Sequence, residues 1–364
     1  MMSGLFFEIL NAFGLAPERC RIKPIGSGHI HDTYLVDQCG EGHPPLILQR
    51  INTYVFPDVV VLMSNMERVT AHVAFKNRKE GRDPATSGLV LVEATEGKSW
   101  VGNEEIGYWR MFWFIENQHS YERAEGNDMA FEGGRAIARF QHLLSDMDPS
   151  LVSEVIPHFH DLRFRLENFM ISREKASKER SGAARALIEM VEQYSDEALH
   201  ILSESEKLGL PGRLVHNDTK FNNILFNSEK KATCLIDLDT VMPGYSWFDV
   251  GDALRTCATS SSEDEEDVRK IDFNLETFKA FAHGFISGGS AFLTADEISL
   301  LPGAPVYFSY MQGVRFLTDY LEGDVYYKTA FPGHNLQRAR AQLTLTGKML
   351  EKKSQMHDFI MSLK

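Results

Sequence analysis

The sequence predicts an α+β protein of two lobes, a smaller β-rich lobe followed by a larger and mostly helical one. Short β-branched and aromatic runs separated by turn residues dominate the first part of the chain, whereas apolar residues recur at helical spacing after about residue 128. A polar stretch follows the aromatic run 108–115 and marks the boundary. The predicted lobes therefore cover residues 1–116 and 117–364.

Composition excludes several classes of protein. The 364 residues are 43% hydrophobic and 24% charged, which is ordinary for a chain that buries a sizeable core. A net charge of −13 argues against a nucleic-acid partner, which would require a basic face. No apolar run approaches the ~20 residues of a membrane span, and Glu8 and Asn11 interrupt the apolar start, which favours an amphipathic helix over a signal peptide. We expect no membrane partner; the oligomeric state stays open, and a monomer is compatible.

The cysteines predict neither a disulfide framework nor a zinc site. None of the four forms a C-x-x-C pair, and the run around Cys234 is apolar and strand-like. A reducing, cytoplasmic location is therefore the expectation.

The N-terminal lobe begins with a predicted helix over residues 5–14, followed by strand, glycine turn and strand over 22–36. Gly26, Ser27 and Gly28 form the turn, and glycine lets a backbone approach a ligand closely; an ordinary hairpin turn is the alternative. The third strand, 46–51, carries Gln49 and Arg50 but no lysine, and strand alternation lets only one of the two face a cleft.

The rest of this lobe is predicted as a helix over 58–80 and two strands, 88–92 and 108–115. Glu67 on the helix is either a partner for a cation on the third strand or a solvated surface residue. The second strand, 108–115, ends in Glu116 and Asn117, and this polar connection suits a hinge between lobes.

The C-terminal lobe is predicted to be mainly helical. The predicted helical regions are 130–144, 161–208 and 272–364, and the last includes helices at 304–322 and 336–362. The acidic run 260–267 is predicted to be a solvated connection.

Residues 214–252 carry the chemistry. His216 and Asp218 lie after a short apolar run, Asn223 follows Asp218 by five residues, and Asp237 ends the next apolar run. A carboxylate for an acceptor hydroxyl, then an amide and a carboxylate for metal ions, is the order found in phosphoryl-transfer sites. Asp218 is the predicted catalytic residue. Asn223 and Asp237 are predicted ligands of Mg²⁺, which prefers hard oxygen donors, and His216 is expected to brace the loop.

These residues imply ATP as the phosphoryl donor. The predicted nucleotide site combines the glycine turn, the third strand, the hinge and one lysine inside the catalytic loop. Its members are Gly26, Ser27, Gly28, Arg50, Glu116 and Lys220. Lys220 is the candidate cation for the γ-phosphate in the absence of a strand lysine.

The chain resembles the aminoglycoside phosphotransferase and choline kinase superfamily in HNDTKFNNIL and LIDLDT. It resembles the N-acetylhexosamine 1-kinase family more closely, in GSGHIHDTYLV, QRINTYVFPD, FDVGDALR and RFLTDYLEGDVYY, and this resemblance covers nearly the whole chain. The superfamily resemblance implies the protein-kinase-like fold. The closer one implies ATP-dependent phosphorylation of the anomeric hydroxyl of N-acetylglucosamine or N-acetylgalactosamine, giving the sugar 1-phosphate.

The resemblance also implies a sugar site. Besides Asp218, it includes Asp239 and Thr240 next to the metal acid, and Arg315 and Tyr326 near the C-terminus. Arginine and aspartate hydrogen-bond pairs of hydroxyls well, and a tyrosine can cover a sugar face. His29 in the glycine turn is a further candidate. For Arg315, an ion pair with the residue four positions on is the alternative.

Two other functions remain open. The same fold could phosphorylate another small hydroxyl compound, such as choline, an aminoglycoside, homoserine or methylthioribose. The missing strand lysine is the only support for a non-catalytic, nucleotide-binding regulatory protein. The residues do not distinguish N-acetylglucosamine from N-acetylgalactosamine.

Overall fold

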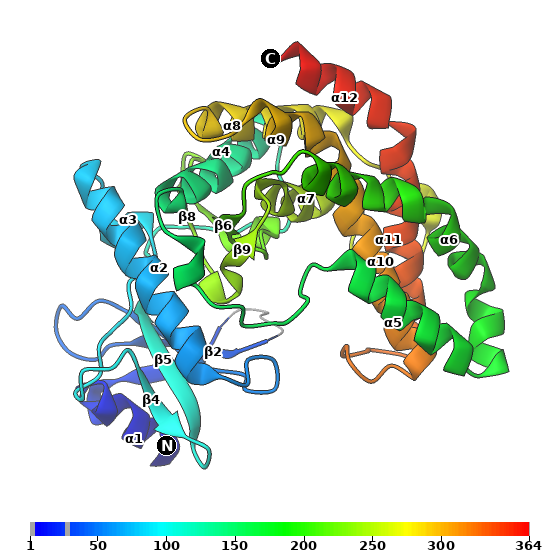
Figure 1. Cartoon of the computed structure of the whole chain (residues 1–364). Helices are drawn as coiled ribbons and strands as arrows, with labels where there is room; N and C mark the ends of the chain where they lie inside the picture. The colour runs from blue at the N-terminus through cyan, green and yellow to red at the C-terminus, as the bar shows by residue number, and fades with distance from the viewer. Residues whose placement is uncertain (1–3, 26–29, 364) are drawn as a thin grey trace.

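The computed structural model describes residues 4–25 and 30–363 and shows the two predicted lobes (Figure 1). The smaller lobe is a five-stranded antiparallel sheet with strand order β1-β2-β3-β5-β4. Its strands are β1 Arg21–Pro24, β2 Asp32–Asp37, β3 Leu46–Arg50, β4 Trp100–Asn103 and β5 Gly107–Trp113. The strand predicted at 88–92 is wrong, because only Leu91 forms an isolated bridge there, to Phe112.

The two faces of this sheet have different neighbours. Helix α1, Gly4–Ala12, packs its Ile9 and Leu10 into a small core with Leu48 and Trp109. The opposite face belongs to the main core, which also contains helix α2, Val59–Lys79. Because side chains alternate along a strand, residues adjacent in β3 or β5 point to opposite faces of the sheet.

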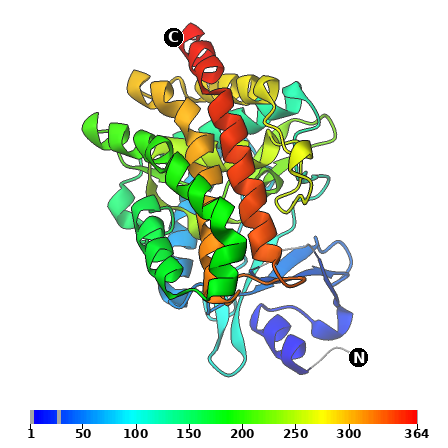
Figure 2. The same ribbon diagram turned by 90° about the vertical axis from the view of Figure 1, so that its right-hand side faces the viewer.

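The connection after β5 runs through residues 114–126 to helix α4, Asn127–Leu144, and the predicted lobe boundary falls within it. The larger lobe is mostly helical, as predicted. Its further helices are α5 Leu162–Lys175, α6 Lys178–Lys207, α7 Ser246–Cys257, α8 Leu275–Gly289, α9 Ala295–Leu300, α10 Ala304–Glu322, α11 His334–Glu351 and α12 Lys353–Ser362. Helix α10 packs against α5, α6, α7 and α11, and α5, α6, α10 and α11 form one flank of the lobe (Figure 2).

The larger lobe also contains two small antiparallel sheets of two strands each. Strand β6, Arg213–Val215, pairs with β9, Met242–Gly244, and β7, Ile224–Phe226, pairs with β8, Ala232–Leu235. None of the helices in residues 4–25 and 30–363 is long and apolar enough to cross a membrane.

The acidic run 260–267 is a largely exposed connection without helix or strand, as predicted, and it also contacts the helices. Glu263 Oε1 lies 2.8 Å from a guanidinium nitrogen of Arg255, and Asp264 Oδ2 lies 3.1 Å from His334 Nε2. Gln337 donates to the carbonyl oxygen of Asp264 at 2.7 Å. A local charge pattern does not predict these contacts, because most of the partners are distant in the sequence.

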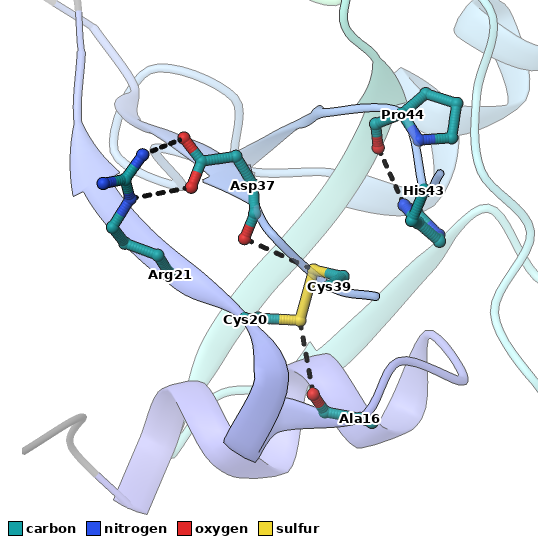
Figure 3. Close-up of a disulfide and its surroundings, with 7 residues drawn as sticks. All are labelled: Ala16, Cys20, Arg21, Asp37, Cys39, His43 and Pro44. Carbon is teal, nitrogen blue, oxygen red and sulfur yellow. Dashed lines mark hydrogen bonds and ion pairs between the residues drawn. A yellow bond between two sulfur atoms is a disulfide. The ribbon is translucent and has the colours of Figure 1, made fainter. Parts of the chain in front are cut away.

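Cys20 and Cys39 form a disulfide with a Cα–Cα distance of 4.1 Å (Figure 3). The cysteine spacing predicted no disulfide framework, and it did not indicate this single bond. The two cysteines are 19 residues apart, and the β1–β2 register, in which Arg21 faces Asp37, brings them together. Arg21 Nε also lies 2.8 Å from Asp37 Oδ1, which closes the same end of the hairpin. A spacing rule for short Cys motifs does not detect a pair that depends on strand register.

Candidate active site

Asp249 of helix α7 anchors the loop that carries Asp218. Its carboxylate accepts the backbone N–H groups of His216 at 3.0 Å and Asn217 at 2.8 Å. Thr219 Oγ1 donates to the Asp249 carbonyl oxygen at 2.6 Å. Asp249 is fully buried, and burial raises its pKa. No sequence pattern indicates this role, because a helical aspartate does not reveal which distant loop it supports.

His216 links the same loop to the segment that leads to Asp237. Its Nδ1 accepts the backbone N–H of Asp218 at 3.2 Å, so Nε2 carries the hydrogen and donates to the carbonyl oxygen of Ile236 at 2.8 Å. The ring is fully buried. His216 therefore holds the two acidic segments at a constant spacing.

Hydrogen bonds to Asp218 orient the side chain of Asn223. The amide nitrogen Nδ2 donates to the Asp218 carbonyl oxygen at 2.8 Å and lies 3.3 Å from its carboxylate Oδ2. This leaves the amide oxygen Oδ1 for another ligand. Lys220 Nζ lies 3.1 Å from Asp218 Oδ1. Burial acts to raise the pKa of Asp218, but the surrounding charges, of which Lys220 is the strongest, together outweigh it and lower that pKa.

Asp237 follows strand β8 in a left-handed conformation, with φ of 63° and ψ of 56°. Burial first, and then the charges of Asp239 and Asp218, raise its pKa to about 7. A divalent cation would relieve this repulsion. The Asp237 carboxylate and the Asn223 amide oxygen are the hard donors that fit Mg²⁺.

Asp239 and Thr240 have internal partners. Asp239, 3% exposed, forms a two-point ion pair with Arg110 of strand β5 and lies 3.2 Å from His31 Nε2. Thr240 Oγ1 donates to the carbonyl oxygen of His216 at 2.8 Å. His31, Asp237 and Asp239 place ligand atoms within 4.8 Å of one another. Asp239 is nevertheless engaged by Arg110, so the structure does not present it as a free sugar ligand.

Arg315 lies on α10 within an aromatic cluster. Its guanidinium carbon is 5.9 Å from the ring centre of Phe159 and 5.7 Å from that of Tyr327. The alternative ion pair with Asp319 is wrong. That carboxylate instead accepts the backbone N–H groups of the loop after α10, from Val325, Tyr326 and Tyr327, at 2.9, 2.7 and 3.0 Å. Asp319 thus fixes the loop that carries Tyr326, whose side chain is exposed.

Two residues that the sequence did not indicate, His160 and Arg165, lie near Arg315. His160 Nε2 donates to the carbonyl oxygen of Asn217 at 2.7 Å, and burial lowers the pKa of His160 to about 3. Arg165 of α5 donates to the carbonyl oxygens of His158 and Phe159 at 3.0 and 3.2 Å. In the described part of the chain, His160 Nδ1 and Arg165 Nε are buried without a hydrogen-bond partner. No local sequence pattern marks either residue.

The predicted nucleotide residues are distributed unevenly. Lys220 lies beside Asp218, and Glu116 is exposed in the connection between lobes. Arg50 faces Trp109, 5.9 Å from its ring centre, on the sheet face that α1 covers. The structure therefore does not bring Arg50 to Asp237. Gly26, Ser27, Gly28 and His29 lie outside the described residues.

Glu67 of α2 does not contact a strand cation in this structure. Its carboxylate accepts the hydroxyl of Ser99. The strand–helix ion pair considered for Glu67 is therefore not formed.

The sequence and the fold both have known relatives. Residues 21–282 match the model of a family described as phosphotransferase enzyme family. An aminoglycoside phosphotransferase from Alicyclobacillus acidocaldarius superposes with a TM-score of 0.64 at 12% identity, covering 98% of this chain and 96% of its own. A choline kinase from Cryptosporidium parvum gives 0.60 at 14% identity, covering 94% and 92%.

A spectinomycin phosphotransferase in complex with ADP and spectinomycin gives a TM-score of 0.51 at 12% identity, covering 92% of this chain and 93% of its own. At these identities the structural matches show the fold alone, which is the bilobal kinase-like fold predicted from the sequence.

Proposed function

This chain belongs to the phosphotransferase enzyme family, and we propose that it transfers the γ-phosphoryl group of ATP to the anomeric hydroxyl of an N-acetylhexosamine. Phosphoryl transfer to a small molecule follows from the family. The sugar, the position phosphorylated and the use of Mg²⁺ are the proposed parts.

The arrangement of Asp218, Asn223 and Asp237 carries the catalytic part of the proposal. Asp218 is positioned by its own backbone bonds to His216 and Asn223, and it would orient the acceptor hydroxyl and receive its proton. Asn223 Oδ1 and Asp237 would hold Mg²⁺, which supplies charge neutralisation at the phosphates. Lys220, 3.1 Å from Asp218, would add a positive charge on the same side.

We call the region around His160, Arg165 and Arg315 the acceptor side, because the acceptor is proposed to bind there. Its positive charge supports a sugar over a cationic substrate. Within residues 4–25 and 30–363, the hydrogen bonds of Arg165 and Arg315 go to carbonyl and amide oxygens and not to carboxylates. Repulsion by Arg315 contributes to a lowered pKa of Arg165, after the larger effect of burial. Two guanidinium groups would repel choline, ethanolamine or an aminoglycoside. A neutral acetamido sugar offers them a carbonyl oxygen and hydroxyl groups instead.

Two polar atoms on the acceptor side, which have no hydrogen-bond partner in the described residues, would also suit a sugar. His160 is neutral and protonated on Nε2, so its Nδ1 is an acceptor for a sugar hydroxyl. Arg165 Nε is a donor for an oxygen. Tyr326, exposed on the loop fixed by Asp319, could cover one face of the ring.

The direct test is ³¹P NMR of mixtures containing the protein, Mg-ATP and one acceptor each. N-acetylglucosamine, N-acetylgalactosamine, choline, kanamycin, homoserine and methylthioribose form the panel. The proposal expects a hexosamine 1-phosphate signal that is absent with Asp218→Asn. Phosphorylation of another acceptor without any hexosamine product would contradict the sugar assignment. ATP binding without transfer to any acceptor would favour the regulatory alternative.

A further inference from the structure

A buried ion pair joins the two lobes next to the metal acid. Arg110 belongs to strand β5 of the N-terminal sheet, and Asp239 lies two residues after Asp237 in the other lobe. Their side chains are 1% and 2% exposed. Both terminal nitrogens of Arg110 contact the Asp239 carboxylate, one on each oxygen. The contact therefore has the two-point geometry that orients a carboxylate as well as neutralising it.

Neighbouring side chains hold both partners of this pair. Gln49 Oε1 accepts from Arg110 Nε at 3.0 Å and from Nη2 at 2.9 Å. On the other side, His31 Nδ1 accepts the backbone N–H of Asn52 at 3.1 Å, so a neutral His31 carries its hydrogen on Nε2 and donates it to Asp239 at 3.2 Å. With that hydrogen in place, His31 is a hydrogen-bond donor and not a free metal ligand.

The position of this pair matters because the third strand, β3, has no lysine. Gln49 and Arg110 are direct neighbours on β3 and β5, and both face the C-terminal lobe, whereas Arg50 faces α1. In protein kinases a lysine of the third strand supplies the N-lobe cation. Here that place holds a neutral glutamine, which supports a cation on the adjacent strand.

We propose that Arg110 is a positioning residue for the metal site, and that Asp239 is its anchor and not a ligand of the acceptor. Held on both oxygens, Asp239 fixes the single turn Leu238–Thr240. That turn begins at Asp237, whose left-handed backbone needs support from its surroundings. The pair thus couples the nucleotide-side sheet to the direction of the metal carboxylate. The inference rests on the proposed function only in assigning Asp237 to the metal.

The first test substitutes Arg110→Lys, which keeps the positive charge but loses the two-point contact. We expect the Mg²⁺ concentration that gives half-maximal activity to rise about tenfold, and kcat to fall, with KM for the acceptor within about twofold of wild type. Arg213→Lys is the matched control, because Arg213 and Glu297 form a similar two-point pair, at 2.6 and 2.9 Å, away from the metal acid. It should lower Tm without changing the Mg²⁺ requirement.

The second test separates positioning from simple stability. Removing one member of a buried pair leaves the other charge unpaired and can prevent folding, whereas replacing both by apolar residues is often tolerated. The double variant Arg110→Met with Asp239→Leu should therefore fold and still show the raised Mg²⁺ requirement. A double variant with wild-type Mg²⁺ dependence would overturn the proposal.

Binding of ATP, measured by calorimetry at several Mg²⁺ concentrations, makes the test independent of the sugar assignment. If the wild type binds Mg-ATP but phosphorylates no hexosamine, the proposed function fails while the positioning role is still measured. If Asp239→Asn raises KM for the acceptor at least tenfold with unchanged Mg²⁺ dependence, Asp239 is a sugar ligand and the inference is wrong.

Discussion

The metal side of the candidate site comes from one continuous stretch of sequence, residues 214–252, whereas the acceptor side is assembled from segments far apart. Asp218, Asn223 and Asp237 are set by local bonds to His216 and to each other. His160, Arg165 and Arg315 come from the segment before α5, from α5 itself and from α10. A site built from one short stretch can be recognised as a sequence motif. A site built from several helices depends on how those helices pack.

The largest expected effect is on the metal side. Asp218→Asn keeps the shape of the side chain but removes the proton acceptor, so kcat should fall roughly 10²–10⁴-fold. Calorimetric binding of Mg-ATP should stay within a few-fold of wild type. A variant that keeps full turnover would exclude Asp218 as the catalytic residue.

Asp249→Asn tests the support beneath the same loop. One of the two carboxylate oxygens that accept the N–H groups of His216 and Asn217 becomes an amide nitrogen. We expect the free energy of unfolding to fall by about 1–3 kcal/mol, and kcat to fall on the order of tenfold, as followed by denaturant titration and steady-state kinetics. Unchanged stability would mean that the loop does not depend on this anchor.

The raised pKa of Asp237 predicts that metal binding depends on pH. A carboxyl group whose pKa is about 7 in the metal-free protein holds a proton below that pH, and Mg²⁺ must displace it. Apparent Mg²⁺ affinity should therefore weaken by up to roughly tenfold per pH unit below 7 and level off above it. Titration of Mg²⁺ at constant ATP between pH 5.5 and about 8.5 checks this. A flat profile would contradict the raised pKa.

On the acceptor side, Arg165→Gln removes a charge that has no carboxylate partner in the described chain. KM for the N-acetylhexosamine should rise about tenfold, equivalent to about 1.4 kcal/mol, with little change in KM for ATP. Arg163→Gln is the control, since Arg163 pairs with Glu206 at the exposed surface, where such pairs contribute little. Equal effects of both variants would remove Arg165 from the acceptor site.

The smallest expected effect on activity is that of the disulfide. Cys20→Ser with Cys39→Ser should lower the free energy of unfolding by about 3 kcal/mol, because the bond closes a loop of moderate length. Turnover should stay close to that of the wild type, since the antiparallel pairing of β1 with β2 still closes the hairpin. Native thiol labelling without reductant should modify none of the cysteines, because Cys234 and Cys257 are buried. Rapid labelling of two thiols would mean that the bond is absent.

By itself, the sequence determined the lobe order and most of the helices, because hydrophobic periodicity encodes them directly. It also predicted Asp218, Asn223 and Asp237 as a phosphoryl-transfer site from their short spacing, and that assignment stays a prediction. Strand alternation also required Gln49 and Arg50 to face opposite ways. Only the tertiary structure decided which of them faces the C-terminal lobe. It also paired Cys20 with Cys39, Asp319 with the loop after α10, and Arg110 with Asp239. Each of these contacts joins residues whose distance depends on strand register or helix packing, and no local pattern in the chain records it.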